Sequence, residues 1–328
     1  MEGTRVLVTG AGGFIGSHLV ERLVAAGAKV RALLHYGAEG GFGNARFMPR
    51  EARLAVEWLH GDLLDGEFIA RATANQEVVF HLAAMVAIPH SYRAPRSFVE
   101  ANTVGTLNVL EAARAAAVQR VVHTSTSEVY GSAQYIPMDE AHPLRAQSPY
   151  AATKIGADKL AESYHAAFGL PVVTVRPFNT FGPRQSARAV IPTVIGQLLG
   201  GAKQVMLGAT TPIRDMTFVT DTVDGMITAA TAAGIEGRTF NLGTGHGESV
   251  GEIAARIVAA FGTEAEVTLD PQRLRPPASE VDRLISDNTA FRKATGWAPR
   301  VSLDEGLRAT IDFFRAHPGL LPTQEYAT

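Results

Sequence analysis

RVLVTGAGGFIGSHL, residues 5–19, decides the fold of this chain. Its β-branched start predicts a strand over 5–9, and the amphipathic run over 14–26 predicts a helix. Between them, glycines permit a tight turn and the close approach of a pyrophosphate, while the helix N-terminus offers free N–H groups. This strand–loop–helix order predicts a dinucleotide-binding loop that consists of Gly10, Gly12, Gly13, Phe14, Ile15 and Gly16.

The following residues alternate short apolar runs with longer amphipathic ones. The pattern predicts strands over 29–34, 56–59, 77–81, 120–124 and 172–176, and helices over 97–118 and 150–168. Continuous apolar strands separated by helices are typical of a parallel sheet covered on both faces. The sequence therefore predicts an α/β fold with a doubly wound parallel sheet of the Rossmann type.

A change in amino-acid composition after Pro177 indicates a second, smaller domain. Residues 178–188 are rich in Gly, Pro, Asn and Arg, which is typical of a functional loop rather than a core element. Helices are predicted over 191–199, 250–261 and 303–314. We expect residues 1–177 to form the dinucleotide-binding domain, with a return segment near 217–243. Residues 178–328 are expected to form mainly a partly interleaved substrate-binding domain.

Composition restricts the class of protein. The chain has 328 residues, of which 46% are hydrophobic and 19% charged, a formal net charge of −2 and no cysteine. The near-neutral charge gives no reason to expect nucleic acid or a membrane as a partner. Without cysteine there are no disulfides, thiolate catalysis or sulfur-bound zinc, and no metal site is predicted. Because no signal peptide or bilayer-spanning run is recognisable, we expect a cytoplasmic protein, and an enzyme is the leading hypothesis.

The end of the second predicted strand bears on the choice of dinucleotide. The acidic residue that usually binds the adenosine ribose there is missing, because the sequence reads Leu33-Leu34-His35-Tyr36. NAD is favoured, but NADP stays open since Arg31 or a protonated His35 could accept a 2′-phosphate. Asp62 is placed to bind the adenine amino group; the alternative is that it caps the following helix.

Two short motifs point to catalysis. Tyr150 and Lys154 are four residues apart and so share one helix face. A cation beside the phenol, together with the charge of an oxidised nicotinamide, would stabilise the phenolate and make Tyr150 a base. Residues 124–131, Thr-Ser-Thr-Ser-Glu-Val-Tyr-Gly, follow a strand, at the edge where such sheets bind ligands. Thr126 can hydrogen-bond a reacting hydroxyl, and Glu128 can act as acid or base.

These motifs together resemble the extended short-chain dehydrogenase/reductases, the NAD-dependent epimerase/dehydratase family that acts on nucleotide sugars. The resemblance covers nearly the whole chain and includes TGAGGFIGSHL, HLAA, NTVGTLNVLEAA, YAATK, RPFNTFGPRQ, RDMTFVTD and FNLGTG. Longer strings, among them HTSTSEVYGSAQYIPMDE and RLRPPASEVDRL, are similar to NDP-N-acetylglucosamine 4,6-dehydratases of legionaminic-acid-type pathways. Both UDP- and GDP-linked sugars occur in that group.

The resemblance implies a 4,6-dehydratase, a hydro-lyase. Tyr150, with Lys154 and Thr126, would take the C4 hydroxyl proton while hydride passes to NAD; Glu128 would remove the C5 proton before water leaves C6 and hydride returns there. Thr126-Ser127-Glu128 differs from the Thr-Asp-Glu of glucose-type dehydratases. A serine hydroxyl is a poor general acid, so either Glu128 handles both transfers or a water relays the proton.

The resemblance also implies binding residues and a partner. Further cofactor contacts are expected from His35, Asp62, Leu63, Leu82, Ala83, Ala84, Thr124 and Pro177, besides Tyr150 and Lys154. Substrate contacts are expected from Met85, Val86, Asn179, Arg188, Arg214 and Arg275, with Arg184 a further phosphate candidate. Met85 and Val86 could equally be core residues. A homodimer is implied through the helices that contain Ser97 and Tyr150.

Three other functions remain open. A UDP-glucuronate decarboxylase shares Thr-Ser-Glu but needs a cation for the C6 carboxylate. A hexose 4-epimerase usually has small or neutral residues after the Thr, which disfavours it here. A non-enzymatic NAD(P)-binding scaffold is the remote alternative, because such proteins tend to lose the Tyr/Lys pair that this chain keeps.

Overall fold

The computed structural model describes residues 1–37, 41–274 and 276–321. Its centre is a seven-stranded parallel sheet in the order β10-β6-β5-β4-β1-β2-β3. The strands are β1 (Arg5–Thr9), β2 (Lys29–Leu34), β3 (Glu57–His60), β4 (Val78–His81), β5 (Arg120–Thr124), β6 (Val172–Pro177) and β10 (Thr239–Leu242). The predicted α/β class and doubly wound parallel sheet are confirmed.

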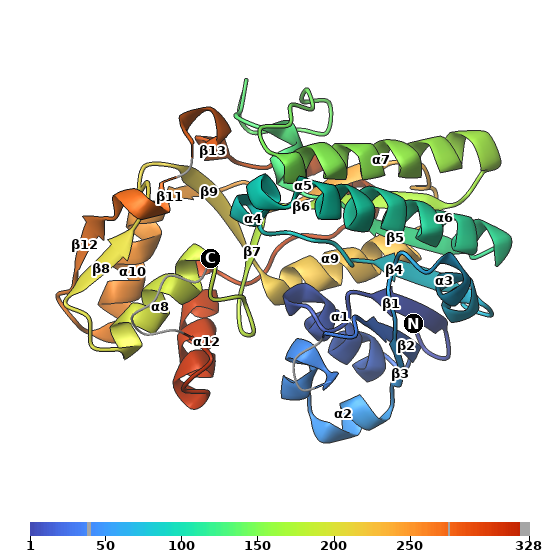
Figure 1. Ribbon diagram of the computed structural model, residues 1–328, viewed down its shortest axis with the longest axis horizontal. Helices are drawn as coiled ribbons and strands as arrows, with labels where there is room; N and C mark the ends of the chain where they lie inside the picture. Colours follow the sequence, from blue (N-terminus) through green and yellow to red (C-terminus); the bar gives the residue numbers. More distant parts are fainter. Residues whose placement is uncertain (38–40, 275, 322–328) are drawn as a thin grey trace.

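Helices cover both faces of this sheet (Figure 1). One face packs against α1 (Phe14–Ala25) and α9 (Val219–Thr231), and the other against α3 (Gly66–Thr73), α6 (Gly105–Ala115) and α7 (Pro149–Phe168). Within β1, Val6 and Val8 belong to the first core and Leu7 to the second, since neighbouring side chains of a strand point to opposite faces. Burial on both faces explains why the strand is apolar throughout.

The smaller C-terminal part lies beyond the carboxyl ends of the strands (Figure 1). Two small sheets build it, with β9 (Ile213–Phe218) between β11 (Gly247–Ser249) and β13 (Arg283–Leu284), and β8 (Gln204–Leu207) beside β12 (Glu266–Leu269). Its helices are α8 (Val190–Leu199), α10 (Val250–Phe261), α11 (Thr289–Thr295) and α12 (Leu303–Ala316). The segment that contains α9 and β10 returns to the large sheet, where β10 pairs with β6.

Two predicted elements differ from the structure. The segment 178–188 is not only a loop, because β7 (Asn179–Phe181) lies inside it and pairs with β9. Phe178 and Phe181 are fully buried, so aromatic burial overrides the turn-rich composition. The predicted helix over 97–118 starts earlier, as α5 (Pro95–Phe98), passes through a π-helical stretch, η3 (Val99–Val104), and continues as α6.

Short elements complete the description. They are η2 (Gly43–Phe47), α2 (Arg50–Leu54), α4 (Ile88–Arg93), η4 (Ser127–Tyr130), η5 (Pro271–Arg273) and η6 (Pro277–Ser279). Of the helices in the described ranges, none combines the length and the apolar character that crossing a membrane requires. No group of His, Asp or Glu residues suited to a metal ion occurs in the same part of the chain.

Candidate active site

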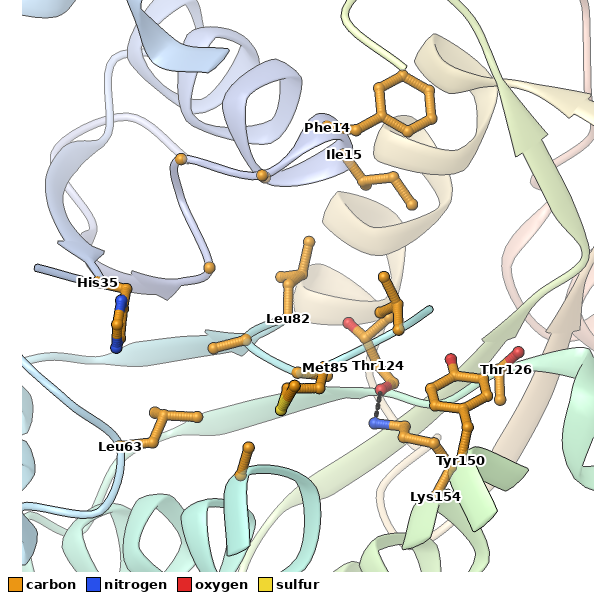
Figure 2. A pocket seen from close by; sticks show the side chains of 18 of the residues that line it. Phe14, Ile15, His35, Leu63, Leu82, Met85, Thr124, Thr126, Tyr150 and Lys154 are labelled. Atoms are coloured by element: carbon orange, nitrogen blue, oxygen red, sulfur yellow. Dashed lines mark hydrogen bonds between the residues drawn. The ribbon is translucent and has the colours of Figure 1, made fainter. Parts of the chain in front are cut away.

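A cavity of about 1050 Å³ lies along the carboxyl ends of the parallel strands. It runs from the glycine loop past the ends of β2 and β4 to the catalytic motifs on β5 and α7 (Figure 2). The candidate residues that line it are Gly10, Gly12, Gly13, Phe14, Ile15, Gly16, His35, Asp62, Leu63, Leu82, Ala83, Ala84, Met85, Val86, Thr124, Thr126, Ser127, Glu128, Tyr150, Lys154, Pro177 and Asn179. One continuous cavity therefore joins the predicted cofactor residues to the predicted catalytic ones.

The glycine loop is packed too tightly for side chains. Gly10 has a φ of +73°, and a Cβ there would lie 2.7 Å from the backbone nitrogen of Ala83. A Cβ on Gly16 would lie 2.1 Å from the Gly10 carbonyl oxygen. Gly13 is the N-cap of α1 and no side chain of the described residues caps that end. The first N–H groups of α1 are thus left to bind an anion, as a pyrophosphate requires.

Substituting Gly16→Ala should destabilise the protein by about 3 kcal/mol, because the new methyl group must displace backbone. Urea denaturation of the two proteins measures the difference in unfolding free energy. The matched control is Gly156→Ala in α7, whose Cβ would lie 3.6 Å from the Thr103 hydroxyl oxygen. Since alanine favours helix over glycine, this control should be neutral or stabilise by roughly 0.5 kcal/mol. Equal losses in both variants would contradict the prediction.

The adenosine end of the cavity holds little positive charge. His35 Nε2 lies 3.7 Å from Asp62 Oδ2, and both side chains are substantially exposed. Arg31 points elsewhere, since its guanidinium binds Glu57 and the Ala72 carbonyl oxygen. Lys154 is the one Lys or Arg in the described lining, and it lies at the catalytic end. These residues suit a ribose with free hydroxyls better than one with a 2′-phosphate.

Asp62 does not cap the next helix. Its carboxylate accepts a hydrogen bond of 2.9 Å from the Leu64 N–H, whereas Asp65 is the N-cap of α3 and accepts from Phe68 N–H. The alternative reading of Asp62 as a helix cap is therefore wrong, because the helix begins one turn later. Asp62 lines the cavity instead.

The catalytic helix presents Tyr150 and Lys154 to the cavity. Ser148 caps α7 by accepting from Ala151 N–H, and Pro149 occupies the first turn, where its missing N–H costs nothing. Lys154 Nζ donates a hydrogen bond of 2.7 Å to the Thr124 carbonyl oxygen at the end of β5 (Figure 2). This bond fixes the ammonium between the helix and the strand.

Burial governs the ionisation of both side chains. Burial raises the pKa of Tyr150, and the charges of Glu128 and Asp158 add to the rise, although the hydrogen bond with Thr126 opposes it. Burial lowers the pKa of Lys154 to about 8, against the attraction of the Asp158 carboxylate. In the protein alone burial dominates, and the expectation that Lys154 and an oxidised nicotinamide together stabilise the phenolate stays a prediction. Ionisation of Tyr150 depends on further positive charge in the cavity.

Glu128 and Ser127 share a short turn, η4, beside Tyr150. Thr126 is the N-cap of this turn, and its hydroxyl accepts from Glu128 N–H at 3.2 Å. Both Ser127 and Glu128 line the cavity, and the Glu128 charge acts on the Tyr150 phenol. A carboxylate, a threonine hydroxyl and a phenol therefore meet in one wall of the cavity. Such a set can take a proton from a hydroxyl and a second proton from a neighbouring carbon.

Comparison with known proteins agrees with this geometry. Residues 7–310 match the protein family described as GDP-mannose 4,6 dehydratase. The chain is also 36% identical to the UDP-glucose 4-epimerase of Mycolicibacterium smegmatis, over 95% of this chain and 98% of that protein. The chain belongs to the NAD-dependent epimerase/dehydratase family.

Two solved structures of dehydratases resemble this chain. The dTDP-glucose 4,6-dehydratase DesIV from Streptomyces venezuelae, with NAD and TYD bound, is 31% identical with a TM-score of 0.87, covering 97% of this chain and 99% of that one. TunA, an NAD-dependent NDP-hexosamine 5,6-dehydratase involved in tunicamycin biosynthesis, is 29% identical with a TM-score of 0.84, covering 96% and 99%. Dehydratases of the epimerase/dehydratase family thus share the fold of this chain.

Some lining residues were not predicted from sequence. Gly43 and Asn44 line the cavity because the Asn44 N–H donates to the Gly12 carbonyl oxygen and brings their loop against the glycine loop. Ser97, Glu100 and Ala101 reach the cavity from the helical segment around η3. The loop at Gly43 has no sequence pattern of its own, and helical periodicity does not show which side chains of 97–101 face a cavity, so neither set could be found without the fold.

Asn102 is a further functional residue that was not predicted, although a sequence motif contains it. Its side chain is fully buried, accepts from Met85 N–H at 2.7 Å, and donates to the Met85 carbonyl oxygen and the Thr153 hydroxyl. It thereby fastens the cavity loop at Met85 to the catalytic helix. Asn102 opens the NTVGT string of the epimerase/dehydratase family, which pointed to it.

None of the candidate arginines within the described residues lines the cavity. Arg184 is buried and its guanidinium binds Glu21 on α1 at 2.6 Å. Arg214 pairs with Glu280 at 3.2 Å inside the smaller part of the chain, and Arg188 is exposed on the loop before α8. Arg275 lies outside the described residues. Substrate binding by Arg188, Arg214 and Arg275 stays a prediction.

Proposed function

We propose that this chain is a 4,6-dehydratase that converts an NDP-linked N-acetylglucosamine to the 4-keto-6-deoxy sugar with NAD as cofactor. The position of Glu128 carries the proposal, because its carboxylate lines the cavity close enough to influence the Tyr150 phenol. A 4-epimerase needs one acid/base group at C4, whereas a dehydratase needs a second base at C5. The pair Tyr150 and Glu128 meets the second requirement.

The described residues fit NAD. The uncapped start of α1 suits the pyrophosphate, Asp62 and Leu63 flank the adenosine end, and Lys154 with Pro177 lies at the nicotinamide end. Two buried oxygens at that end, Thr124 Oγ1 and Asn179 Oδ1, have no hydrogen-bond partner among the described residues. Buried polar atoms without partners favour a polar ligand there. When bound, NAD would supply an acceptor for the hydride from C4 of the sugar. It would also supply the positive charge that ionisation of the Tyr150 phenol requires.

The protein groups then divide the proton transfers among themselves. Tyr150 takes the proton of the C4 hydroxyl, and Thr126 holds the phenol oxygen by the hydrogen bond between them. Lys154, fixed on the Thr124 carbonyl oxygen, adds a positive charge to the same end of the cavity. Once C4 is a ketone, the C5 hydrogen is acidic and Glu128 removes it. Protonated Glu128 is then placed to give its proton to the leaving C6 hydroxyl, directly or through a water that Ser127 holds.

The charge of the cavity lining favours a dehydratase over a decarboxylase. A glucuronate carboxylate at C6 needs a cation, but the described lining offers Lys154 alone, and its ammonium already binds the Thr124 carbonyl oxygen. Glu100 and Glu128 add negative charge to the same lining. A neutral C6 hydroxyl suits this wall better than a carboxylate does.

The sugar is inferred from two independent likenesses. The strings HTSTSEVYGSAQYIPMDE and RLRPPASEVDRL resemble those of NDP-N-acetylglucosamine dehydratases. TunA, an NDP-hexosamine 5,6-dehydratase, shares the fold over nearly the whole chain. Similarity to the M. smegmatis epimerase keeps 4-epimerisation as the second candidate.

A homodimer is part of the proposal. Val99 and Val104, around η3, and Phe168, at the end of α7, are exposed apolar side chains on the helices expected to form the interface. Exposed apolar groups on neighbouring helices favour burial against a second copy. Light scattering of the purified protein tests this, and a monomer mass at working concentration would contradict it.

The rate should fall as the pH rises above about 8, the pKa to which burial lowers Lys154. The sign follows from the charge: the ammonium is present below this pH and is lost above it, so the phenolate loses its neighbouring cation. A pH profile of kcat/KM measures the effect. The control Lys159→Met, an exposed position on α7, should keep the alkaline limb. A level rate up to about pH 10, near the ordinary pKa of lysine, would contradict it.

The function is tested by incubating the purified protein with UDP- and GDP-N-acetylglucosamine, without added reductant, in ordinary and heavy water. Loss of one water, with one solvent deuterium at C5 and no net NADH, is the expected result. An unchanged mass with inversion at C4 would establish an epimerase instead. Unchanged substrate with both sugars would refute the sugar assignment, and UDP-glucose, GDP-mannose and UDP-glucuronate would be tried next.

A further inference from the structure

A buried ion pair lies behind the catalytic wall, outside the cavity lining. It joins Asp158 on α7 to Arg176 on β6, and both side chains are almost fully buried. The Arg176 Nη2 and Nε atoms lie 3.0 and 3.2 Å from Asp158 Oδ2. Neither side chain reaches the cavity, so the proposed chemistry leaves this pair without a task.

Asp158 fastens the start of the catalytic segment. Its Oδ2 accepts a hydrogen bond of 2.8 Å from the Ser125 hydroxyl, and its Oδ1 accepts from His123 Nε2 at 3.1 Å. His123 belongs to the end of β5, and Ser125 follows the strand directly before Thr126. Lys154 lies one helical turn before Asp158 on α7 and binds the neighbouring Thr124 carbonyl oxygen. The two side chains therefore hold the end of β5 together.

Arg176 fastens the other end of the segment. Its Nη1 donates to the Tyr130 hydroxyl at 3.0 Å, and its guanidinium lies 4.9 Å from the centre of the Tyr130 ring. The Tyr130 hydroxyl in turn donates to Asn241 Oδ1 on β10 at 2.7 Å. Tyr130 is the last residue of η4, the turn that contains Ser127 and Glu128.

We propose that the Asp158–Arg176 pair is a positioning device that holds residues 125–130 by both ends and so sets the place of Glu128 relative to Tyr150. The inference rests on the proposed dehydratase function for the role of Glu128, although the fastening itself does not depend on it. A carboxylate on a short turn is positioned accurately relative to the substrate only if the turn itself is held in place. A displacement of about 1 Å can lower the rate 100-fold.

The pair is ionised at neutral pH. Burial raises the pKa of Asp158, but the hydrogen bond from His123 and the nearby charges of Arg176 and Lys154 outweigh it and lower that pKa to about 2. Removing one partner would leave the other as an unpaired buried charge, so Asp158→Ala and Arg176→Ala could unfold the protein. A milder change is needed for the test.

Tyr130→Phe is that change. It removes the hydroxyl that joins Arg176 to Asn241 but keeps the ring against the guanidinium. We expect the rate of C5 proton removal to fall about tenfold and C4 oxidation to be unchanged. Reduced nicotinamide would then accumulate during turnover, which absorbance shows directly, while KM stays the same.

Amide hydrogen exchange is the second measurement and needs no substrate. In Tyr130→Phe the amides of Ser125 and Gly131, bonded to the Val175 and Glu128 carbonyl oxygens, should exchange about tenfold faster, while amides of α7 keep their protection. The matched control is Tyr135→Phe, which removes an exposed hydroxyl bonded to Asp139. It should change neither measurement.

The outcomes are distinguishable. Unchanged exchange at Ser125 and Gly131, or an equal fall of C4 oxidation and C5 proton removal, would overturn the positioning role. If the wild-type protein dehydrates none of the sugars, the proposed function fails, and hydrogen exchange alone still decides whether the pair holds the segment.

Discussion

Tyr150→Phe is expected to lower kcat for C4 oxidation roughly 10³-fold, the usual contribution of a well-placed general base. The substitution removes one oxygen atom and leaves the ring in its apolar contacts with Phe98. Because burial raises the pKa of Tyr150, its hydroxyl should stay protonated until a positive charge enters the cavity. Pre-steady-state absorbance of reduced nicotinamide, with saturating sugar, measures the C4 step alone.

The control for this prediction is Tyr164→Phe on the same helix. Its hydroxyl donates to Glu111 on α6 and lies outside the cavity lining, so the C4 step should keep its rate. A Tyr150→Phe protein that forms reduced nicotinamide at the wild-type rate would show that another group takes the C4 proton. The protein's affinity for NAD, measured by calorimetry, should change little, which separates loss of catalysis from loss of binding.

Glu128→Gln should abolish dehydration and leave C4 oxidation largely intact. The amide has the size of the carboxylate but cannot accept the C5 proton, so water elimination should fall roughly 10³-fold. The charge of Glu128 also contributes to the raised pKa of Tyr150, and its removal should make the phenol easier to ionise. The expected result is a reduced nicotinamide that persists and a 4-keto sugar that keeps its C6 oxygen.

Deuterium uptake at C5 from heavy water provides the measurement for Glu128→Gln. The control is Glu162→Gln, an exposed position on α7 that is paired with Lys159. It should incorporate deuterium at the wild-type rate. Wild-type uptake in Glu128→Gln would assign the C5 proton to another base and remove the main argument against a 4-epimerase.

The two variants together separate the chemistries of the family. An epimerase depends on Tyr150 and should tolerate Glu128→Gln, whereas a dehydratase requires both groups. This contrast is sharper than the comparison of sequences, because relatives of this chain include an epimerase and dehydratases at similar identity. The side chains in the cavity wall, rather than the fold, therefore carry the functional argument.

Most strands of the large sheet and several helices could be predicted from local sequence patterns. The strands over 5–9, 29–34 and 120–124 and the helix over 250–261 were predicted with the bounds that the structure has. Period and apolar content decide such elements locally, and the glycine loop is a contiguous motif whose turn geometry needs no distant partner. The same holds for Tyr150 and Lys154, since helical spacing alone places them on one face.

Tertiary structure decided what depends on contacts between distant segments. Asp158, Arg176, Tyr130 and Asn241 are separated by up to 111 residues in the chain, and no local pattern joins them. The strand in 179–181 forms because β9 pairs with it and a core receives Phe181, although its neighbours in sequence favour a turn. Periodicity predicts only which face of an element a side chain lies on. Its partners and its burial depend on how the sheet and helices pack, and these set the pKa values of Tyr150 and Lys154.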